Sequence, residues 1–306
     1  MKNVEVYKFI QKKNILNMKK CITTIFCILD DFCKIYEEWE MKKLIPSAMK
    51  RRREGQLSLA ELLTIVLYFY LSPCKNFKNY YLYYLPHKKC FNLPSYSRII
   101  QLWSRLILPL TIMLQLFKGE DSGIYFIDST KLSICHAKRT NKNRVFADIA
   151  KLGRSSYGWF MGFKLHIVIN NKGAIMAVKL TKGNSSDISA APFITQGLQG
   201  KIFGDKGYIS KHLFTTLYNK GLRLFTSIRR DMKNHLLDLE DKILLRKRSI
   251  VETVFNVLKN SMHLEHTRHR SPLNFLVHIL ACVNAYNINK KFHYPLFFPI
   301  HASSLS

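Results

Sequence analysis

Three acidic residues stand where carboxylates often do chemistry. Asp128 follows the apolar run Ile124–Ile127, and Asp205 follows Ile202–Gly204. Each run predicts a short buried strand, so we expect each aspartate to close a strand and to be held rigidly at a surface. Glu252 lies in a segment that is otherwise basic and apolar. If the strands and this segment pack together, the three carboxylates converge.

Clustered carboxylates repel one another, and divalent cations relieve that repulsion most easily. Hard oxygen ligands of this kind suit Mg2+ or Mn2+. Two such ions, spaced about 3.5 to 4 Å apart, can clamp an in-line phosphoryl displacement. One ion then activates water or a 3′-hydroxyl and the other stabilises the leaving oxygen, so the acids serve as ligands and not as covalent nucleophiles.

Two of these acids also have an ordinary structural explanation. Asp205 alone would most often cap the turn or helix that follows it. Glu252 could form an ion pair with Arg248, four residues earlier on a helix predicted for 246–261. On that helix Arg248, Glu252 and Lys259 share one face, which turns Glu252 toward the strand ends.

Other polar residues near the acids have two interpretations each. Lys206 and Tyr208 follow the second aspartate closely, where they either contact a phosphate or are simply packed or exposed to solvent. Lys164 and His166 fall on the same side of an alternating strand. We interpret the histidine as structural. Asp187 is a further acid near the cluster, although we expect it to cap a helix.

The histidines near the C-terminus repeat with a regularity that resembles a metal site. His263, His266 and His269 are spaced by three residues, with Arg268 and Arg270 interleaved. The interleaved arginines favour a basic turn that faces DNA over a metal site.

Charge is the unusual feature of the composition. The 306 residues contain 48 Lys and Arg against 20 Asp and Glu, a formal net charge of +28. Such an excess repels itself in isolation and favours a polyanionic partner, most plausibly nucleic acid. A membrane surface, a merely basic enzyme and a compositional bias toward lysine are the alternatives.

The cysteines and apolar runs indicate the compartment. Seven cysteines, an odd number without a Cys-x-x-Cys pair, predict neither a disulfide framework nor a zinc site, so a reducing cytoplasm is expected. The most apolar run, Leu57–Leu71, contains Glu61 and is too short to cross a bilayer. We therefore expect no membrane partner.

Residues 1–118 are predicted to be all-helical. A capping box at Ser58 and Glu61 opens a helix to Tyr70, and further helices are expected at 76–85 and 95–117. Short helices joined by tight turns are compatible with a DNA-end-binding domain. The basic run Lys50–Arg53 is either a phosphate contact or a solvated helix end.

After Gly119 short apolar runs alternate with helical patterns. We expect strands at 123–128, 162–169 and 174–180, a helix at 187–198, a strand ending at 205, a helix at 210–220, a strand at 222–227, and helices at 246–261 and 272–289. The basic stretch 136–157 is predicted to be a mobile loop.

This order of elements is that of a ribonuclease H-like fold, an α/β class in which helices flank both faces of a mixed sheet. We therefore predict a helical domain at 1–118, a catalytic domain at 119–290 and a disordered tail at 291–306.

Three motifs together resemble the DDE transposases of bacterial insertion sequences. They are Ile127-Asp-Ser-Thr130, Gly204-Asp-Lys-Gly-Tyr208 and Arg248-x3-Glu252-x6-Lys259. The segments Phe77–Tyr81, Ser95–Arg98 and His266–Pro272 are most similar to the insertion-sequence 982 family. The resemblance covers roughly residues 30 to 290.

The resemblance implies that Asp128, Asp205 and Glu252 bind two Mg2+ ions, with Mn2+ possible. It also implies DNA cleavage and strand transfer at terminal inverted repeats by a DNA-bound homodimer, in a bacterial cytoplasm near the nucleoid. Double-stranded DNA, both transposon ends and target, is the expected partner, without a small-molecule substrate. The expected DNA contacts are Arg248, Lys259, Lys206, Tyr208, Lys164, Arg268 and Arg270.

One position departs from the related pattern Tyr-x2-Arg-x3-Glu-x6-Lys. Leu245 stands where the tyrosine is expected, which removes any phosphate contact made there. The alternatives are a metal-dependent DNA nuclease without strand transfer and an inactive DNA-binding derivative.

Overall fold

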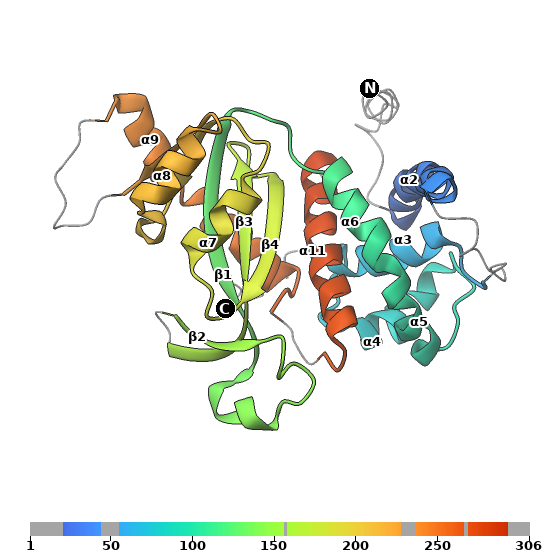
Figure 1. Cartoon of the computed structure of the whole chain (residues 1–306). Coiled ribbons are helices and arrows are strands. Elements are labelled where there is room, and N and C mark those ends of the chain that lie inside the picture. The colour runs from blue at the N-terminus through green and yellow to red at the C-terminus, as the bar shows by residue number, and fades with distance from the viewer. Residues whose placement is uncertain (1–20, 44–54, 156–157, 228–236, 266–268, 293–306) are drawn as a thin grey trace, which may run out of the picture. The chain divides into compact units, whose positions relative to one another are not determined.

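The computed structural model describes residues 21–43, 55–155, 158–227, 237–265 and 269–292 (Figure 1). These residues form two compact units: unit 1 has those up to Leu116 and from Leu276 onward, and unit 2 has Phe117–Phe275. The run Lys50–Arg53, Arg268 and most of the 291–306 tail lie outside the described residues, so the predictions made for them stay predictions.

Unit 1 is helical. Its elements are α2 (Ile22–Lys43), α3 (Leu59–Leu71), α4 (Phe77–Asn79), a π-helical turn (Tyr80–Tyr84), a 3-10 turn (Pro86–Lys88), α5 (Tyr96–Leu102), a 3-10 turn (Trp103–Leu106), α6 (Ile107–Leu116) and the part of α11 (Pro272–Phe292) that begins at Leu276. The helices that precede the sheet are thus as predicted.

Helix α3 is the centre of this unit because nearly every one of its side chains is buried. The predicted capping box starts it: the Glu61 amide donates to the Ser58 hydroxyl at 3.2 Å, and the Ser58 amide donates to the Glu61 carboxylate at 2.7 Å. Tyr80 and Tyr81 pack nearby with 0% and 2% exposure, so these two rings belong to the core.

Residues after Leu276 pack with these helices, although the predicted catalytic domain extended to residue 290. Asn284 donates hydrogen bonds to the carbonyls of Leu110 in α6 and Leu280 in α11, at 2.9 and 2.8 Å. Tyr70 and His278 share a 2.8 Å hydrogen bond. Polar contacts inside the core therefore hold the last helix in unit 1.

One helical stretch of the described residues is long and apolar enough to cross a membrane by length and composition. It is Tyr96–Leu116, with a mean hydropathy of 1.5, and 39% of its most apolar window is buried. Core helices of soluble proteins share this property, so the expectation of no membrane partner stays a prediction.

Unit 2 is an α/β unit. Its elements are β1 (Ile124–His136), a 3-10 segment (Ala137–Lys142), β2 (Lys151–Ser155), β3 (Gly158–Asn170), β4 (Ile175–Lys182), α7 (Asp187–Ile194), β5 (Gly200–Gly204), a 3-10 turn (Lys206–Tyr208), α8 (Lys211–Tyr218), β6 (Leu222–Thr226), α9 (Leu239–Lys247), α10 (Ile250–Asn256) and a π-helical turn (Val257–Ser261).

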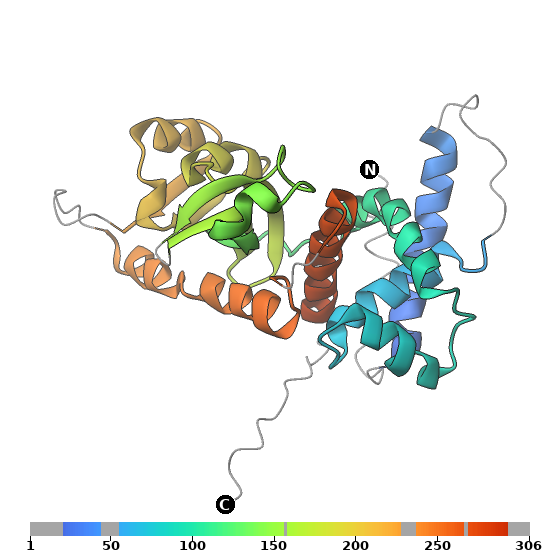
Figure 2. The same ribbon diagram turned by 90° about the horizontal axis from the view of Figure 1, so that it is seen from below.

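The sheet is mixed and has the predicted ribonuclease H-like order. β3 pairs antiparallel with β1, β4 and β2, whereas β5 pairs parallel with β1 and β6. Helices α7 and α8 cover one face, on which Tyr125 and Ile127 pack with Leu213. Figure 2 shows these gold helices on one side of the sheet and the orange α9 and α10 on the other.

Three local predictions were wrong. Strand β1 does not end at Asp128, because pairing with β3 continues it to His136. The stretch 136–157 is not an unstructured loop, because it contains a 3-10 segment and β2. The helix predicted for 246–261 is broken by a turn at Arg248 and Ser249, where the amides of Val251 and Glu252 bond back only three residues.

Candidate active site

The pairing of two strands brings the first two acids to one level of the sheet. β1 and β5 run parallel with Ile124 opposite Lys201 and Phe126 opposite Phe203. Asp128 and Asp205 each lie two residues after this last pair. Both aspartates therefore lie at the end of β5. The Asp205 side chain makes no capping hydrogen bond, which removes the capping explanation.

The third acid reaches the same place from α10. The Arg248 guanidinium lies 3.4 Å from the Asp128 carboxylate and 3.8 Å from each of the Asp205 and Glu252 carboxylates. We call Asp128, Asp205 and Glu252 the acid cluster. The ion pair considered for Glu252 and Arg248 therefore exists, but it is one of three contacts, and the contact to Asp128 is shorter.

Exposure differs across the acid cluster. The side chains of Asp128, Asp205 and Glu252 are 23%, 52% and 65% exposed. Burial raises the pKa of Asp128 to about 6, although the Ser129 amide, which donates to its carboxylate at 2.8 Å, and the Arg248 charge both act to lower it. The charges of Asp205 and Asp187 raise the pKa of Asp128 further, so nearby cations favour the ionised form of this carboxylate.

Alternation along β1 sends neighbouring residues to opposite faces of the sheet. Asp128 turns toward α10, whereas Ser129 turns toward α7 and donates to the Asp187 carboxylate at 2.9 Å. Lys164 of β3 donates to the same oxygen at 3.2 Å and to the Ser185 carbonyl at 2.9 Å. The prediction of Asp187 as a helix cap was wrong, because Ser186 is the N-cap residue of α7 and the Asp187 side chain instead joins α7 to β1 and β3.

His166 has the structural role that its position on β3 predicted. It is fully buried and shares a 2.8 Å hydrogen bond with the Thr181 hydroxyl, and its other ring nitrogen lies 3.8 Å from Asp187. Burial lowers the pKa of His166 to about 4, and the Lys164 and Lys179 charges act in the same direction against Asp187.

Two expected DNA contacts do not fit this geometry. Tyr208 is 1% exposed and packs in the core with Ile127, so its ring cannot reach a phosphate. Lys164 uses its ammonium group to hold Asp187, as described above, and its side chain is only 20% exposed. Lys206 is exposed beside Asp205, as expected of a phosphate contact.

The predicted shared helix face breaks at Lys259. The π-helical turn makes the Met262 amide bond to the Val257 carbonyl, five residues back, which changes the phase of the helix. Lys259 forms a 2.8 Å ion pair with Glu265 and is 18% exposed, so its charge is engaged there. Arg270 is exposed, and Leu245 is half-buried in α9.

The chemistry of the acid cluster fits a hard divalent cation, since it offers three carboxylates around one centre of positive charge. In this arrangement the Arg248 guanidinium supplies that charge. No group of three or more His, Cys, Asp or Glu side chains among the described residues is arranged to hold an ion. The carboxylates contact Arg248 instead, so bound ions would have to replace part of that contact.

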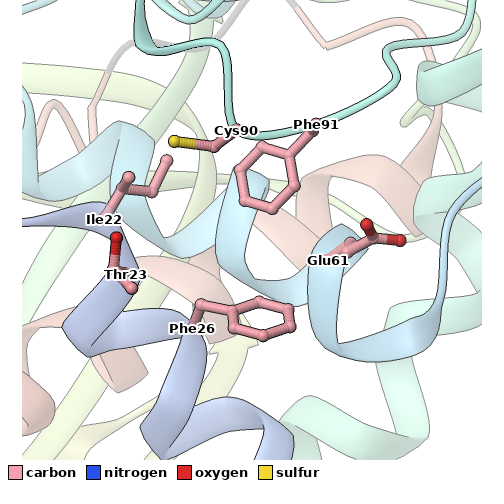
Figure 3. A pocket seen from close by; sticks show the side chains of 6 residues that line it. All are labelled: Ile22, Thr23, Phe26, Glu61, Cys90 and Phe91. Atoms are coloured by element: carbon pink, nitrogen blue, oxygen red, sulfur yellow. The ribbon is translucent and has the colours of Figure 1, made fainter.

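A separate cavity of about 280 Å³ lies in unit 1 (Figure 3). It is lined by Ile22, Thr23, Phe26, Glu61, Cys90 and Phe91. Its one carboxylate, that of Glu61, is already engaged in the capping box. The lining does not provide a set of catalytic groups, and the acid cluster is the candidate active site.

Comparisons with known proteins identify the family of the α/β unit. The family model described as transposase DDE domain matches residues 118–272. A cryo-EM structure of a piggyBac transposase synaptic complex with hairpin DNA is similar over 95% of this chain and 75% of that chain, with 10% identity and a TM-score of 0.40, too weak a likeness to add to the argument. No curated protein matches. Since the family model spans just over half of the 306 residues, the chain belongs to the transposase DDE domain family.

Proposed function

We propose that this chain is a DNA transposase of the bacterial insertion-sequence type, most like the insertion-sequence 982 family. It cleaves DNA at the ends of its element and joins the resulting 3′-hydroxyl to target DNA. The observation that carries the proposal is the convergence of Asp128, Asp205 and Glu252 on the single guanidinium of Arg248.

The three acids are the residues that would hold two Mg2+ ions. When bound, such ions supply an activated water or 3′-hydroxyl and stabilise the leaving oxygen. Strand β1 fixes Asp128, and the Ser129 amide orients its carboxylate. The exposed Lys206 is suited to contact a phosphate next to Asp205.

The partner that we propose is double-stranded DNA, including both the element ends and the target. The net charge of +28 supports this choice, because counterions released from neutralised phosphates drive binding. We further propose a DNA-bound homodimer, since two ends must be brought together, and a location with the nucleoid in a bacterial cytoplasm.

The test is a cleavage and joining assay on DNA that contains the sequences flanking the coding region. A transposase yields Mg2+-dependent nicks at the element ends and joined products with target DNA. Hydrolysis without joining would identify a nuclease instead. Binding without metal-dependent cutting would identify an inactive derivative, to which the departure at Leu245 points.

A further inference from the structure

One strongly basic segment lies away from the acid cluster. Residues 138–154 contain six Lys and Arg and a single acid, Asp148. Within it Arg139, Lys142, Arg144 and Arg154 are exposed, and none of the four forms an ion pair within the described part of the chain. Unneutralised charge of one sign on a folded surface favours a polyanionic partner.

This segment has a rigid support. The Phe146 ring is 1% exposed and packs edge-on against Phe163 and Phe275 at 6.2 and 5.5 Å between centroids. Strand β2 approaches its neighbours so closely that a Cβ on Gly153 would lie 2.2 Å from the Gly183 carbonyl oxygen. The packing of Phe146 and the close approach of Gly153 therefore anchor the backbone that carries the basic side chains. Figure 1 shows this segment in green, around β2.

An exposed aromatic ring adjoins these charges. Trp159 of β3 is 60% exposed and stands opposite Arg154 of β2, whose guanidinium carbon lies 5.9 Å from the ring centroid. Exposed aromatic rings beside arginine are a common means of contacting nucleic acid. We call Arg139, Lys142, Arg144, Arg154 and Trp159 the β2 surface.

The register of β3 relates part of this surface to the acid cluster. Asp128 pairs with Ile167, and Trp159 precedes Ile167 by eight residues, an even number, so both side chains lie on the Asp128 face of the sheet. At about 3.3 Å per residue the separation along β3 is about 26 Å. That length corresponds to roughly eight nucleotides of B-DNA at about 3.4 Å each.

We propose that the β2 surface is a second DNA-binding surface, which holds the backbone of the duplex about eight base pairs from the phosphate at the acid cluster. This proposal rests on the proposed function, because it places the reacting phosphate at Asp128. Arg139, Lys142, Arg144 and Arg154 neutralise phosphates, and Trp159 packs on a sugar or a base.

The test compares two fourfold variants of the full-length Asp128→Asn chain by fluorescence anisotropy with a labelled duplex of mixed sequence. The first carries Arg139→Gln, Lys142→Gln, Arg144→Gln and Arg154→Gln. The control carries Lys211→Gln, Lys220→Gln, Arg223→Gln and Lys242→Gln, which removes the same charge from exposed positions around β6 at the far edge of the sheet.

We expect the first variant to bind roughly tenfold or more weakly at about 100 mM salt and to lower the slope of log K against log salt by about 3 to 4. The control should change both quantities much less. A variant that exchanges Arg and Lys at the same four positions should recover binding. Equal losses in the first variant and the control, or unchanged binding in the first variant, overturn the β2 surface.

The same titration separates this inference from the proposed function. A parent chain that binds DNA while the first variant binds as tightly refutes only the β2 surface, whereas a parent that binds no DNA refutes both. Tryptophan emission tests the ring directly: quenching by DNA should fall in Trp159→Phe and persist in Trp39→Phe, the matched control, because Trp39 is also exposed, at 43%, whereas Trp103 is buried. Quenching that is unchanged by Trp159→Phe overturns the assignment of Trp159.

Discussion

Two carboxylate sites on opposite faces of β1 are held in different ways. The acid cluster contacts one guanidinium at 3.4 to 3.8 Å, and two of its three side chains are more than half exposed. Asp187 is held by a hydroxyl and an ammonium group at 2.9 and 3.2 Å. Where the contacts are long, another cation can replace the guanidinium at little cost in free energy. The shorter, partly buried contacts of Asp187 instead hold α7 against the sheet. The difference predicts chemistry at the first site and stability from the second.

The largest effect is expected on activity. Asp128→Asn, Asp205→Asn and Glu252→Gln should each lower DNA cleavage by more than about 100-fold, because even partners behind a metal ligand typically contribute 10- to 100-fold. DNA binding and the unfolding midpoint should change little. Cleavage assays with matched anisotropy titrations measure this. Retained cutting by any one variant would remove that residue from the ligand set.

Replacement of Asp187 should act on stability instead. Asp187→Ala leaves the partly buried Lys164 without its carboxylate, and we expect a loss of about 2 to 3 kcal/mol in the free energy of unfolding. Asp205→Ala is the matched control, since its carboxylate has one long contact and should cost much less. Urea denaturation of both variants makes the comparison. Equal losses would show that the two sites are held alike.

Lowering the pH should destabilise the fold through protonation of His166, which lies beside Asp187. The pKa of His166 is about 4 in the folded chain and 6.5 ordinarily, so the unfolded chain binds the proton first as pH falls. Stability is therefore lost between about pH 6.5 and 4, by up to roughly 2 to 3 kcal/mol. In His166→Gln this part of the pH dependence should vanish. Urea melts at several pH values test it, and an unchanged slope would contradict the assignment.

The smallest effect is expected from Arg248→Gln. Loss of the guanidinium leaves three carboxylates in mutual repulsion, which should cost about 1 kcal/mol without divalent ions. Added Mg2+ should then raise the melting temperature of the variant more than that of the parent, because the ion no longer competes with an arginine. Thermal melts with and without Mg2+ decide this. Equal shifts in melting temperature would mean that Arg248 and Mg2+ do not compete for the same carboxylates.

The fold was predictable where local pattern and pairing agree. Alternating apolar runs around the Asn170–Gly173 turn predicted β3 and β4, and the buried run before Gly204 predicted β5. The continuation of β1 beyond Asp128 was not predictable, because the residues that follow are largely polar and are held as a strand only by pairing with β3. Local propensity gives way to such long-range contacts.

In the candidate active site, too, some features could be predicted from local sequence and others depend on long-range contacts. The identity of its three acids could be predicted from motifs, since each follows or lies within a recognisable element. The engagement of Lys164 by Asp187 could not, because these residues are 23 positions apart and meet only in the folded unit. The position of Lys259 depends on a π-helical turn, which a regular helical period does not reveal.

The length of β1 also limits which insertions and deletions this chain can tolerate. Strand β1 carries Asp128 and continues to the bulge between Ser133 and Cys135, where β2 pairs with the opposite edge of β3. Inserting a single residue after Asp128 would turn the following side chains to the opposite face, while inserting two would restore the faces and lengthen the strand by about 7 Å. Outside the bulge, which already accommodates one extra residue, viable insertions or deletions in this segment should therefore come in even numbers.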